Sequence, residues 1–563
     1  MSTTATKHPA PQKRSRAFTV AAGIFSSRVF GLARDAIALN FFGIGAHADV
    51  LQAAFRAPNL LVNLLGEGTI SAAFIPVYSR MVEEGREKEA GRLAGSIFGL
   101  LVATVSVLVL LGILFARPLL SVLVLGWVDD AARVSAGELS INRFQLTVDA
   151  VRLIFPMTGF LVLSAWALGI LNSHRRFFIS YFAPVVWNIA IISSFLIGAT
   201  LYLEPEGGQE PTMAMLTRLL FAAFAGGLAG GILQFLVQVP SVFRVLKGFR
   251  VSLSTRVEGV RATLSAFGPA VAGRGIAQIS GYADLFLASL LASGALASLR
   301  SALILYMLPI SLFGLSVAAA ELPELSRMGS EQLTSFLERL SRSIRQSMFL
   351  TIPTAVGYVA LGFLIVGALF RRGAFQEVDN WLVYVVLGGY SLGLVATTLS
   401  RLLQNAFWAL RDTRTPARMA ALRLIVSMGI AVPMMLMLDR WQVTDILDLS
   451  GPDKPLFLGA AGLAFGASVG AWVELWRLGA MLRRRIESFR LAWRRLVKQS
   501  TLALGAAVPA LGLWWLLPAS WPAPVVAALV VSCFAGIYLG MAYTLGWPEL
   551  RYWAGRLGQR RRR

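Results

Sequence analysis

The chain has little of what disulfide-bonded domains, metal enzymes and soluble enzymes are built from. Its 563 residues include one cysteine and three histidines, and only 15% are charged, whereas 56% are hydrophobic. Cys533 has no partner for a disulfide, and the histidines (8, 47 and 174) lack metal-ligand spacing. Soluble proteins carry about 25% charged residues. The composition therefore excludes a soluble enzyme and predicts a fold without a disulfide or a metal centre.

Long apolar segments run through most of the chain instead. A spanning helix needs roughly 20 apolar residues, and a span with its loop uses about 35 to 40, so the chain has room for about 14 spans. The first begins at Ala17 and carries three charges. The other predicted spans are 58–82, 93–117, 147–171, 179–203, 213–243, 262–292, 297–325, 345–370, 381–410, 417–438, 456–481, 497–517 and 522–546. We expect an all-α polytopic membrane protein.

The charge of the chain is strongly basic, with 52 Lys and Arg against 30 Asp and Glu and a net charge of +22. Such an excess can indicate nucleic-acid binding, but here the basic residues collect in alternate loops, as cytoplasmic loops do. The basic segments are 80–92, 175–176, 244–261, 327–345, 411–418, 483–498 and 551–563. The intervening loops 204–210 and 439–453 are acidic, and 518–522 is uncharged. The pattern predicts both termini in the cytoplasm and no nucleic-acid partner.

The two halves of the chain repeat several features in the same order. The matched features are Asp35 and Asp284, Gly45 and Gly294, the segments 76–80 and 323–327, and the loops 172–177 and 409–416. Such repeats predict two six-helix lobes related by a pseudo-twofold axis along the membrane normal, followed by two further helices. The predicted limits are a tail at 1–16, an N-lobe at 17–250, a C-lobe at 251–485, the last helix pair within 486–550 and a basic tail at 551–563.

Charges inside the first span are the best candidates for function. Each costs about 2.5–3.5 kcal/mol at a helix centre, so charged residues there usually face a bundle interior. Arg28 and Arg34 are six residues apart, at about 240° around a helix, and can both line a broad cavity for an anionic headgroup. The alternative is that they snorkel to the interface. Asp35 then acts as an internal counter-ion.

Motifs along nearly the whole chain resemble those of the MurJ (MviN) family of lipid II flippases. The segments that carry the resemblance are 27–36 (SRVFGLARDA), 58–61 (PNLL), 66–68 (GEG), 182–184 (FAP), 230–234 (GGILQ), 238–240 (QVP), 268–270 (GPA), 278–280 (QIS), 291–294 (LASG) and 409–416 (ALRDTRTP). They follow one another in order through twelve predicted helices.

The resemblance implies a fourteen-helix fold of the MOP exporter superfamily in the bacterial inner membrane. The implied activity is the translocation of undecaprenyl-pyrophosphate-linked peptidoglycan precursor by alternating access, without an enzymatic step or a cofactor. Sodium, protons or the membrane potential would drive it, and the cell-wall synthesis machinery would be a partner. By motif, Arg28, Arg34 and Asp49 are expected in the cavity, and Glu67 at a gate or on the second helix.

Two positions depart from the family's pattern. Val62 and Ile304 stand where arginines of the second and eighth helices are expected. Arg300, one turn before Ile304, and Arg274 are available as replacements. Arg300 can equally be an ordinary arginine of an outer loop. The departures leave the carried glycan open.

Asp284 matches a position that the resemblance associates with sodium coupling. Its expected partners on the helix at 417–438 are reduced to Ser427, so Asp284 alternatively pairs with Arg274 or takes a proton. Gly462, Gly466 and Gly470 form a ladder of small residues that predicts close helix packing.

Three other functions remain open from the sequence. One is export of another polyprenyl-pyrophosphate-linked glycan, such as an O-antigen unit. A second is a scaffold that has lost transport, which the absent arginines would favour. The third is a polyprenyl-phosphate-dependent glycosyltransferase, whose acidic site would be Asp129 and Asp130; the alternative for this pair is a solvated loop.

The topology can be tested by labelling single cysteines from outside the cell, in a chain whose own Cys533 is replaced by serine. We expect strong labelling at position 207 and none at position 560, because loop charge places 204–210 outside and the basic tail inside. Strong labelling at 560, or none at 207, contradicts the predicted topology.

Overall fold

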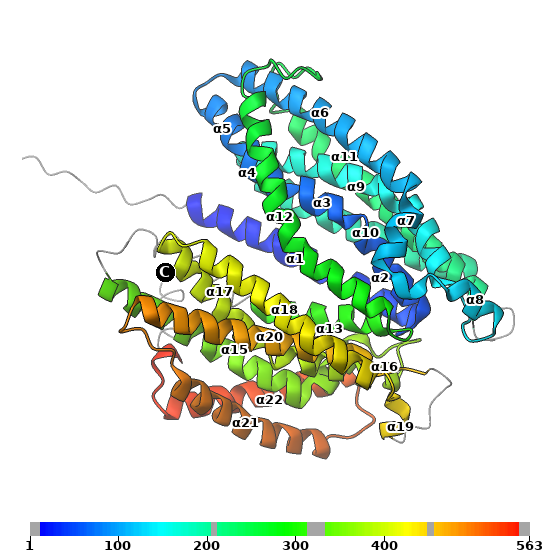
Figure 1. Ribbon diagram of the computed structural model, residues 1–563, viewed down its shortest axis with the longest axis vertical. Helices are drawn as coiled ribbons and strands as arrows, with labels where there is room; N and C mark the ends of the chain where they lie inside the picture. Colours follow the sequence, from blue (N-terminus) through cyan, green and yellow to red (C-terminus); the bar gives the residue numbers. More distant parts are fainter. Residues whose placement is uncertain (1–11, 204–210, 312–332, 448–454, 551–563) are drawn as a thin grey trace, which may run out of the picture. The chain divides into compact units, whose positions relative to one another are not determined.

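The computed structural model of the chain describes residues 12–203, 211–311, 333–447 and 455–550 (Figure 1). Several predicted features lie outside these residues. They are the tail at 551–563, most of the tail at 1–16, the acidic loop at 204–210, the motif at 323–327 and the second half of the helix at 297–325.

The regular secondary structure of the described residues is helical, apart from an isolated bridge between Gln442 and Phe457. Among them, ten helices or runs of helix are long and apolar enough to cross a membrane. This confirms an all-helical polytopic membrane protein. The number is lower than the fourteen expected because three further long helices are less apolar than these ten, and the described part of a fourth apolar helix is short.

The chain forms two compact units, which are described separately. Within the described residues, the first unit contains α1 to α12. Its helices are α1 (Gln12–Phe42), α2 (Ala46–Arg56), α3 (Asn59–Leu65), α4 (Glu67–Ala73), α5 (Ile75–Glu83), α6 (Glu87–Leu114), α7 (Ala116–Leu123), α8 (Asp130–Ser135), α9 (Arg143–Ser173), α10 (Phe177–Tyr202), α11 (Met213–Phe243) and α12 (Val260–Ser289), with a 3-10 turn, η1, at Leu125–Trp127.

The second unit contains Gly43–Gly45 and the helices from α13 onward, which Figure 1 colours from green to red. These helices are α13 (Ala295–Pro309), α15 (Leu333–Phe370), α16 (Glu377–Ser391), α17 (Leu394–Ala409), α18 (Arg414–Leu438), α19 (Val443–Leu447), α20 (Gly459–Arg485), α21 (Trp493–Leu516) and α22 (Ala523–Thr544). The unit boundary follows α12, whereas the sequence repeat places that helix in the C-lobe. The lobe limits at 250 and 485 stay a prediction.

The first unit is organised around α9, most of whose side chains are buried. Helix α9 packs against α2, α6 and α11, so neighbours cover it on several sides. Its Trp166 belongs to a core that also contains Phe74 of α4–α5 and Leu93 of α6. A helix that is apolar on all faces is stable only when surrounded in this way or by lipid.

The second unit has two cores on opposite sides of α15. Phe336, at the start of this helix, packs with Leu399 of α17 and Leu475 of α20. Farther along, Phe349 packs with α21 and α22 through Ala506 and Val530. The last two helices therefore attach to the unit through α15.

Helices α18 and α20 approach each other through the glycines that the sequence singled out. A methyl group on Gly466 would lie 2.6 Å from Cα of Ala431, and one on Gly462 would lie 2.5 Å from the backbone nitrogen of Met435. Gly470 faces Ser427 and the backbone of Arg423 in the same way. The predicted packing role of this ladder is confirmed.

A second ladder lies in the first unit on α6. Gly91, Gly95 and Gly99 face the backbone carbonyl groups of Lys247, Arg250 and Ser252 respectively. The backbone N–H of Ser252 donates to the carbonyl of Gly95 at 3.4 Å. The absence of side chains here lets the segment after α11 lie directly on α6.

We expect Gly466→Ala to destabilise the protein by about 1–3 kcal/mol, because the added methyl overlaps backbone atoms of α18 that cannot rotate away. The matched control is Gly479→Ala on the same helix, where nothing lies within 4 Å of the added methyl. That control should gain about 0.5–1 kcal/mol from the lower flexibility of alanine. Thermal unfolding of both variants in detergent measures the difference, and equal melting temperatures would contradict the packing role.

Candidate functional site

Arg34 is the best-positioned of the predicted cavity residues. Its Nε and Nη2 donate to Oδ1 of Asp35 at 2.9 and 2.7 Å, and Nη1 donates to Oδ1 of Asn188 on α10 at 3.2 Å. The guanidinium also lies 5.1 Å from the ring centroid of Trp187. Three of its five N–H donors are thus engaged, which leaves donors for an anionic ligand. Asp35 neutralises and orients this arginine, as the sequence suggested.

Arg28 lies on the same helix but in different surroundings. Its side chain is exposed, whereas that of Arg34 is half-buried. Six residues of helix separate their Cα atoms by about 9 Å along the axis. The structure does not bring the two arginines onto one narrow face.

Arg56 is a charged residue of the first unit that the sequence interpretation missed. Its Nη2 donates to the carbonyl of Gly281 on α12 at 2.5 Å, and the Tyr282 hydroxyl donates to the carbonyl of Arg56 at 3.1 Å. Asn63 of α3 also donates to Gln278 of α12 at 3.1 Å. These bonds explain why α12 belongs to the first unit. The sequence feature that could have pointed to Arg56 is its charge within the apolar run 46–83.

Arg274 lies against the predicted second span. Its guanidinium occupies the space that a methyl group on Gly68 would need. Glu67, the neighbour of Gly68, is exposed in the first turn of α4, and Asp49 is buried in α2. The structure therefore brings Arg274 close to the Gly66–Gly68 segment of the GEG motif.

The predicted pairing of Asp284 with Arg274 is wrong. Both residues lie on the continuous helix α12, and ten residues of helix separate them by about 15 Å. Asp284 is half-buried near the other end of that helix.

In the second unit, Arg300 is exposed on α13, one turn before the half-buried Ile304. The same unit holds a buried ionic cluster that the sequence did not reveal. Glu474 of α20 accepts hydrogen bonds from Gln404 at 2.8 Å and from Arg423 at 3.1 Å. Arg401 of α17 lies within electrostatic range of both Glu474 and Arg423. The cluster joins α17, α18 and α20.

Asp439 follows the last residue of α18. Burial raises the pKa of its carboxyl group to about 6, although a hydrogen bond from the backbone of Ala292 lowers it. It also faces Gly459 at the start of α20. The sequence analysis placed this residue only in an acidic loop. Its partial burial makes it a second acidic candidate for ion coupling, in addition to Asp284.

Asp130 is neither a solvated loop residue nor a free catalytic acid. It is fully buried, and its oxygens accept bonds from Nε, Nη2 and the backbone N–H of Arg143 at 2.7, 3.0 and 3.2 Å. The same guanidinium lies 4.9 Å from the ring centroid of Trp127. The solvated-loop interpretation is therefore wrong for Asp130, and this geometry removes the main candidate of the glycosyltransferase hypothesis.

Comparison with known proteins decides the family. Residues 38–535 match the family described as Lipid II flippase MurJ. The chain belongs to this family. A protein of Rhizobium tropici named "Probable lipid II flippase MurJ" is 31% identical over 475 residues, which cover 83% of the chain and 80% of the relative. The "Lipid II flippase MurJ" of Burkholderia cenocepacia is 29% identical, with 94% of the chain and 96% of the relative covered.

Solved structures share the fold. A lipid II flippase MurJ in an inward closed conformation superposes with a TM-score of 0.69 at 21% identity, covering 93% of this chain and 99% of that one. A multidrug resistance MATE transporter of the MOP superfamily, in an inward-facing conformation, gives 0.56 at 16% identity, with 82% and 95% covered. Membership of the MurJ family makes the chain a multi-pass membrane protein of a bacterial flippase family, a transporter and not an enzyme.

We expect Asp130→Asn to destabilise the protein by about 3–5 kcal/mol, because it leaves Arg143 buried without a counter-charge. The matched control is Glu138→Gln, which breaks the exposed ion pair with Arg133 at 3.1 Å. That control should cost less than about 1 kcal/mol. Thermal unfolding in detergent compares the two, and equal losses would show that burial of the first pair has no energetic consequence.

Proposed function

We propose that the protein flips lipid II, the undecaprenyl-pyrophosphate-linked peptidoglycan precursor, from the inner to the outer leaflet of the bacterial cytoplasmic membrane by alternating access. Membership of the MurJ family supports this function most strongly. The geometry of Arg34 adds physical support, since an oriented guanidinium with unengaged donors suits a phosphate oxygen.

The proposed topology has fourteen spans, grouped in two six-helix lobes and a final pair, with both termini in the cytoplasm. Besides the ten apolar spans, α1, α12 and α20 have 31, 30 and 27 residues, which exceeds the roughly 20 needed to cross a bilayer. The apolar helix α13 provides the fourteenth. The charges on α1, α12 and α20 are the expected cost of lining a polar pathway.

Arg28, Arg34 and Arg300 hold the pyrophosphate in this mechanism, with Arg274, Asp49 and Glu67 as further substrate-binding residues. Bringing a pyrophosphate into a low-dielectric cavity carries a large desolvation cost unless several cations meet it. An arginine contributed by the second unit adds a contact whose strength depends on conformation. The substrate then has different affinities for the two states, which alternating access requires.

The prenyl tail is assigned to an apolar cavity of the second unit. It has a volume of about 300 Å³ and lies between α15 and α22, where it is lined by Phe349, Pro353, Gly357, Phe534 and Tyr538 among others. Its lining is almost entirely hydrocarbon, as a polyprenyl chain requires. One wall of the cavity is α22, which belongs to the helix pair that the sequence analysis set apart from the two lobes.

Energy for the cycle is assigned to an ion or to the membrane potential, with Asp284 as the candidate for sodium or proton coupling. The protein itself needs no cofactor in this mechanism. Delivery of lipid II at one face and its use at the other make the cell-wall synthesis machinery the expected partner.

Complementation of a flippase-depleted strain tests the proposed role of Arg300. We expect Arg300→Ala to abolish growth at a normal protein level, because two arginines of α1 alone cannot offset the desolvation of the pyrophosphate. Adding Ile304→Arg should restore growth, since the guanidinium returns to the same face one turn away. The control is Arg372→Ala, which removes another exposed arginine of the second unit.

Exposure of lipid II on the outer leaflet is measured in the same strains. Full growth and exposure with Arg300→Ala would assign the anion to other residues, Arg274 first. A different result is that the unaltered chain fails to restore lipid II exposure while it exports another polyprenyl-linked glycan normally. That result would show that the other glycan, and not lipid II, is the transported substrate.

A further inference from the structure

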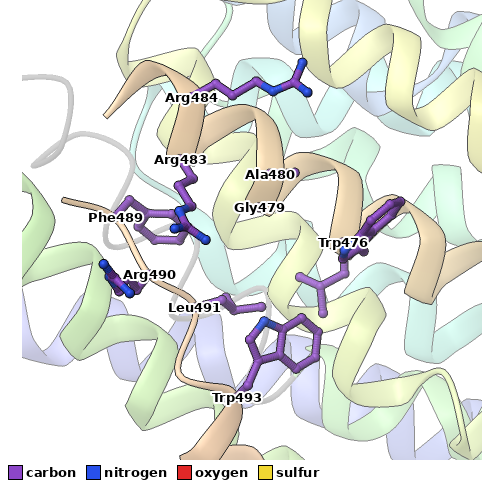
Figure 2. A pocket seen from close by; sticks show the side chains of 10 residues that line it. Trp476, Gly479, Ala480, Arg483, Arg484, Phe489, Arg490, Leu491 and Trp493 are labelled. Atoms are coloured by element: carbon purple, nitrogen blue, oxygen red, sulfur yellow. The ribbon is translucent and has the colours of Figure 1, made fainter. Parts of the chain in front are cut away.

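A basic and aromatic pocket lies where α20 ends and the chain turns into α21 (Figure 2). It has a volume of about 580 Å³. The residues that line it are Leu475, Trp476, Gly479, Ala480, Arg483, Arg484, Phe489, Arg490, Leu491 and Trp493. All of them belong to the second unit, and none is among the residues assigned above to lipid II or to ion coupling.

The three arginines of the pocket give it a net positive charge. Among the described residues, neither an ion pair nor a side-chain hydrogen bond engages the guanidinium groups of Arg483, Arg484 and Arg490, whereas the neighbouring Arg485 pairs with Asp412 at 2.9 Å. None of the described residues that line the pocket is acidic. The C-terminus of α20 contributes only about half a negative charge, which three guanidinium groups exceed. The pocket is therefore suited to an anion.

Two tryptophans line the pocket as well. Trp476 is 59% exposed and Trp493 is 43% exposed. Figure 2 shows their indole rings on one side of the pocket and the guanidinium groups of Arg483 and Arg490 on the other. Trp493 also stacks on Trp472, with ring centroids 6.3 Å apart. Exposed tryptophans at the end of a span are typical of the lipid headgroup level.

An apolar surface continues from the pocket along α21. Val497, Leu504 and Val508 are exposed, and their spacing from Trp493 places all four on one face of the helix. A ligand whose charged end occupied the pocket could lay hydrocarbon along this face. A free phosphate or a nucleotide has no hydrocarbon chain that could pack against this apolar face.

We propose that this pocket binds the headgroup of an anionic phospholipid from the cytoplasmic leaflet. The guanidinium groups of Arg483 and Arg490 bind the phosphate, the indole rings pack against the glycerol region, and the acyl chains follow the exposed face of α21. This proposal rests on the proposed topology, in which the connection between α20 and α21 lies on the cytoplasmic side. It is independent of which lipid-linked glycan the protein transports.

The test uses the full-length protein in zwitterionic detergent, without lipid II, and a phosphatidylglycerol analogue with a photoreactive diazirine near its headgroup. After illumination, peptide mass mapping locates the adducts. We expect them within residues 472–508, and we expect phosphatidylglycerol to suppress them at concentrations where phosphatidylcholine does not. Because each arginine near an anionic lipid contributes about fivefold in binding, replacing Arg483, Arg484 and Arg490 by glutamine should lower labelling at least about tenfold.

The matched control replaces Arg244, Arg494 and Lys498 by glutamine, which removes the same charge from exposed residues that do not line the pocket. Its labelling should stay within about twofold of the unaltered protein, because these three side chains do not line the pocket. Melting temperatures without added lipid establish that both triple variants are folded.

Three results would overturn the proposal. The first is adducts of the unaltered protein that map elsewhere, a result that does not depend on any variant. The second is equal labelling of the two triple variants. The third is suppression by millimolar inorganic phosphate as strong as that by phosphatidylglycerol, which would make the pocket a site for a free anion.

Discussion

Close contact between helix backbones is the constraint on which this structure depends. Lipid is as apolar as the side chains, so the hydrophobic effect does not press spanning helices together, and they associate through van der Waals contact and hydrogen bonds. The glycines of α20 and α6 provide such contact, because backbone atoms of the neighbouring segment occupy the space that side chains would fill. Each compact unit contains one of these ladders.

Tightly placed helices let the protein hold charges at positions where lipid alone would exclude them. Arg34 with Asp35, Arg143 with Asp130, and Arg423 with Glu474 repeat one solution: a buried or half-buried guanidinium beside a carboxylate. The pairs differ in how many guanidinium N–H donors remain available for other ligands. Arg143 donates three bonds to a single fully buried partner, which indicates a structural role. Arg34 divides its donors between two helices and remains half-buried, which suits a binding role.

Much of this could be predicted from the sequence because the relevant signals are local. Apolar segments of span length indicate the polytopic fold, and the spacing of Gly462, Gly466 and Gly470 indicates a packing face on a single helix. Ion pairs between distant segments leave no such signal. Arg423 and Glu474 lie 51 residues apart, and the local sequence around either residue does not indicate that the other is its partner.

The errors have equally physical causes. A solvated loop was one of two interpretations of Asp130, yet this residue is fully buried and pairs with an arginine thirteen residues later, whose guanidinium lies over Trp127. The pairing of Arg274 with Asp284 treated two charges of one span as neighbours, although a continuous helix holds them apart. The count of fourteen spans stays a prediction, because it adds to the ten apolar spans three long helices that carry charges and one short apolar helix.

The contact between α18 and α20 restricts how the second unit can change shape. Sliding one helix along the other by a single residue, about 1.5 Å, would drive Ala431 or Met435 into the backbone that faces it. The same slide would pull Arg423 away from the buried carboxylate of Glu474. These two helices therefore move as one piece during any transport cycle. The bending that such a cycle needs must occur elsewhere, at positions where no glycine ladder or buried ion pair joins the neighbours.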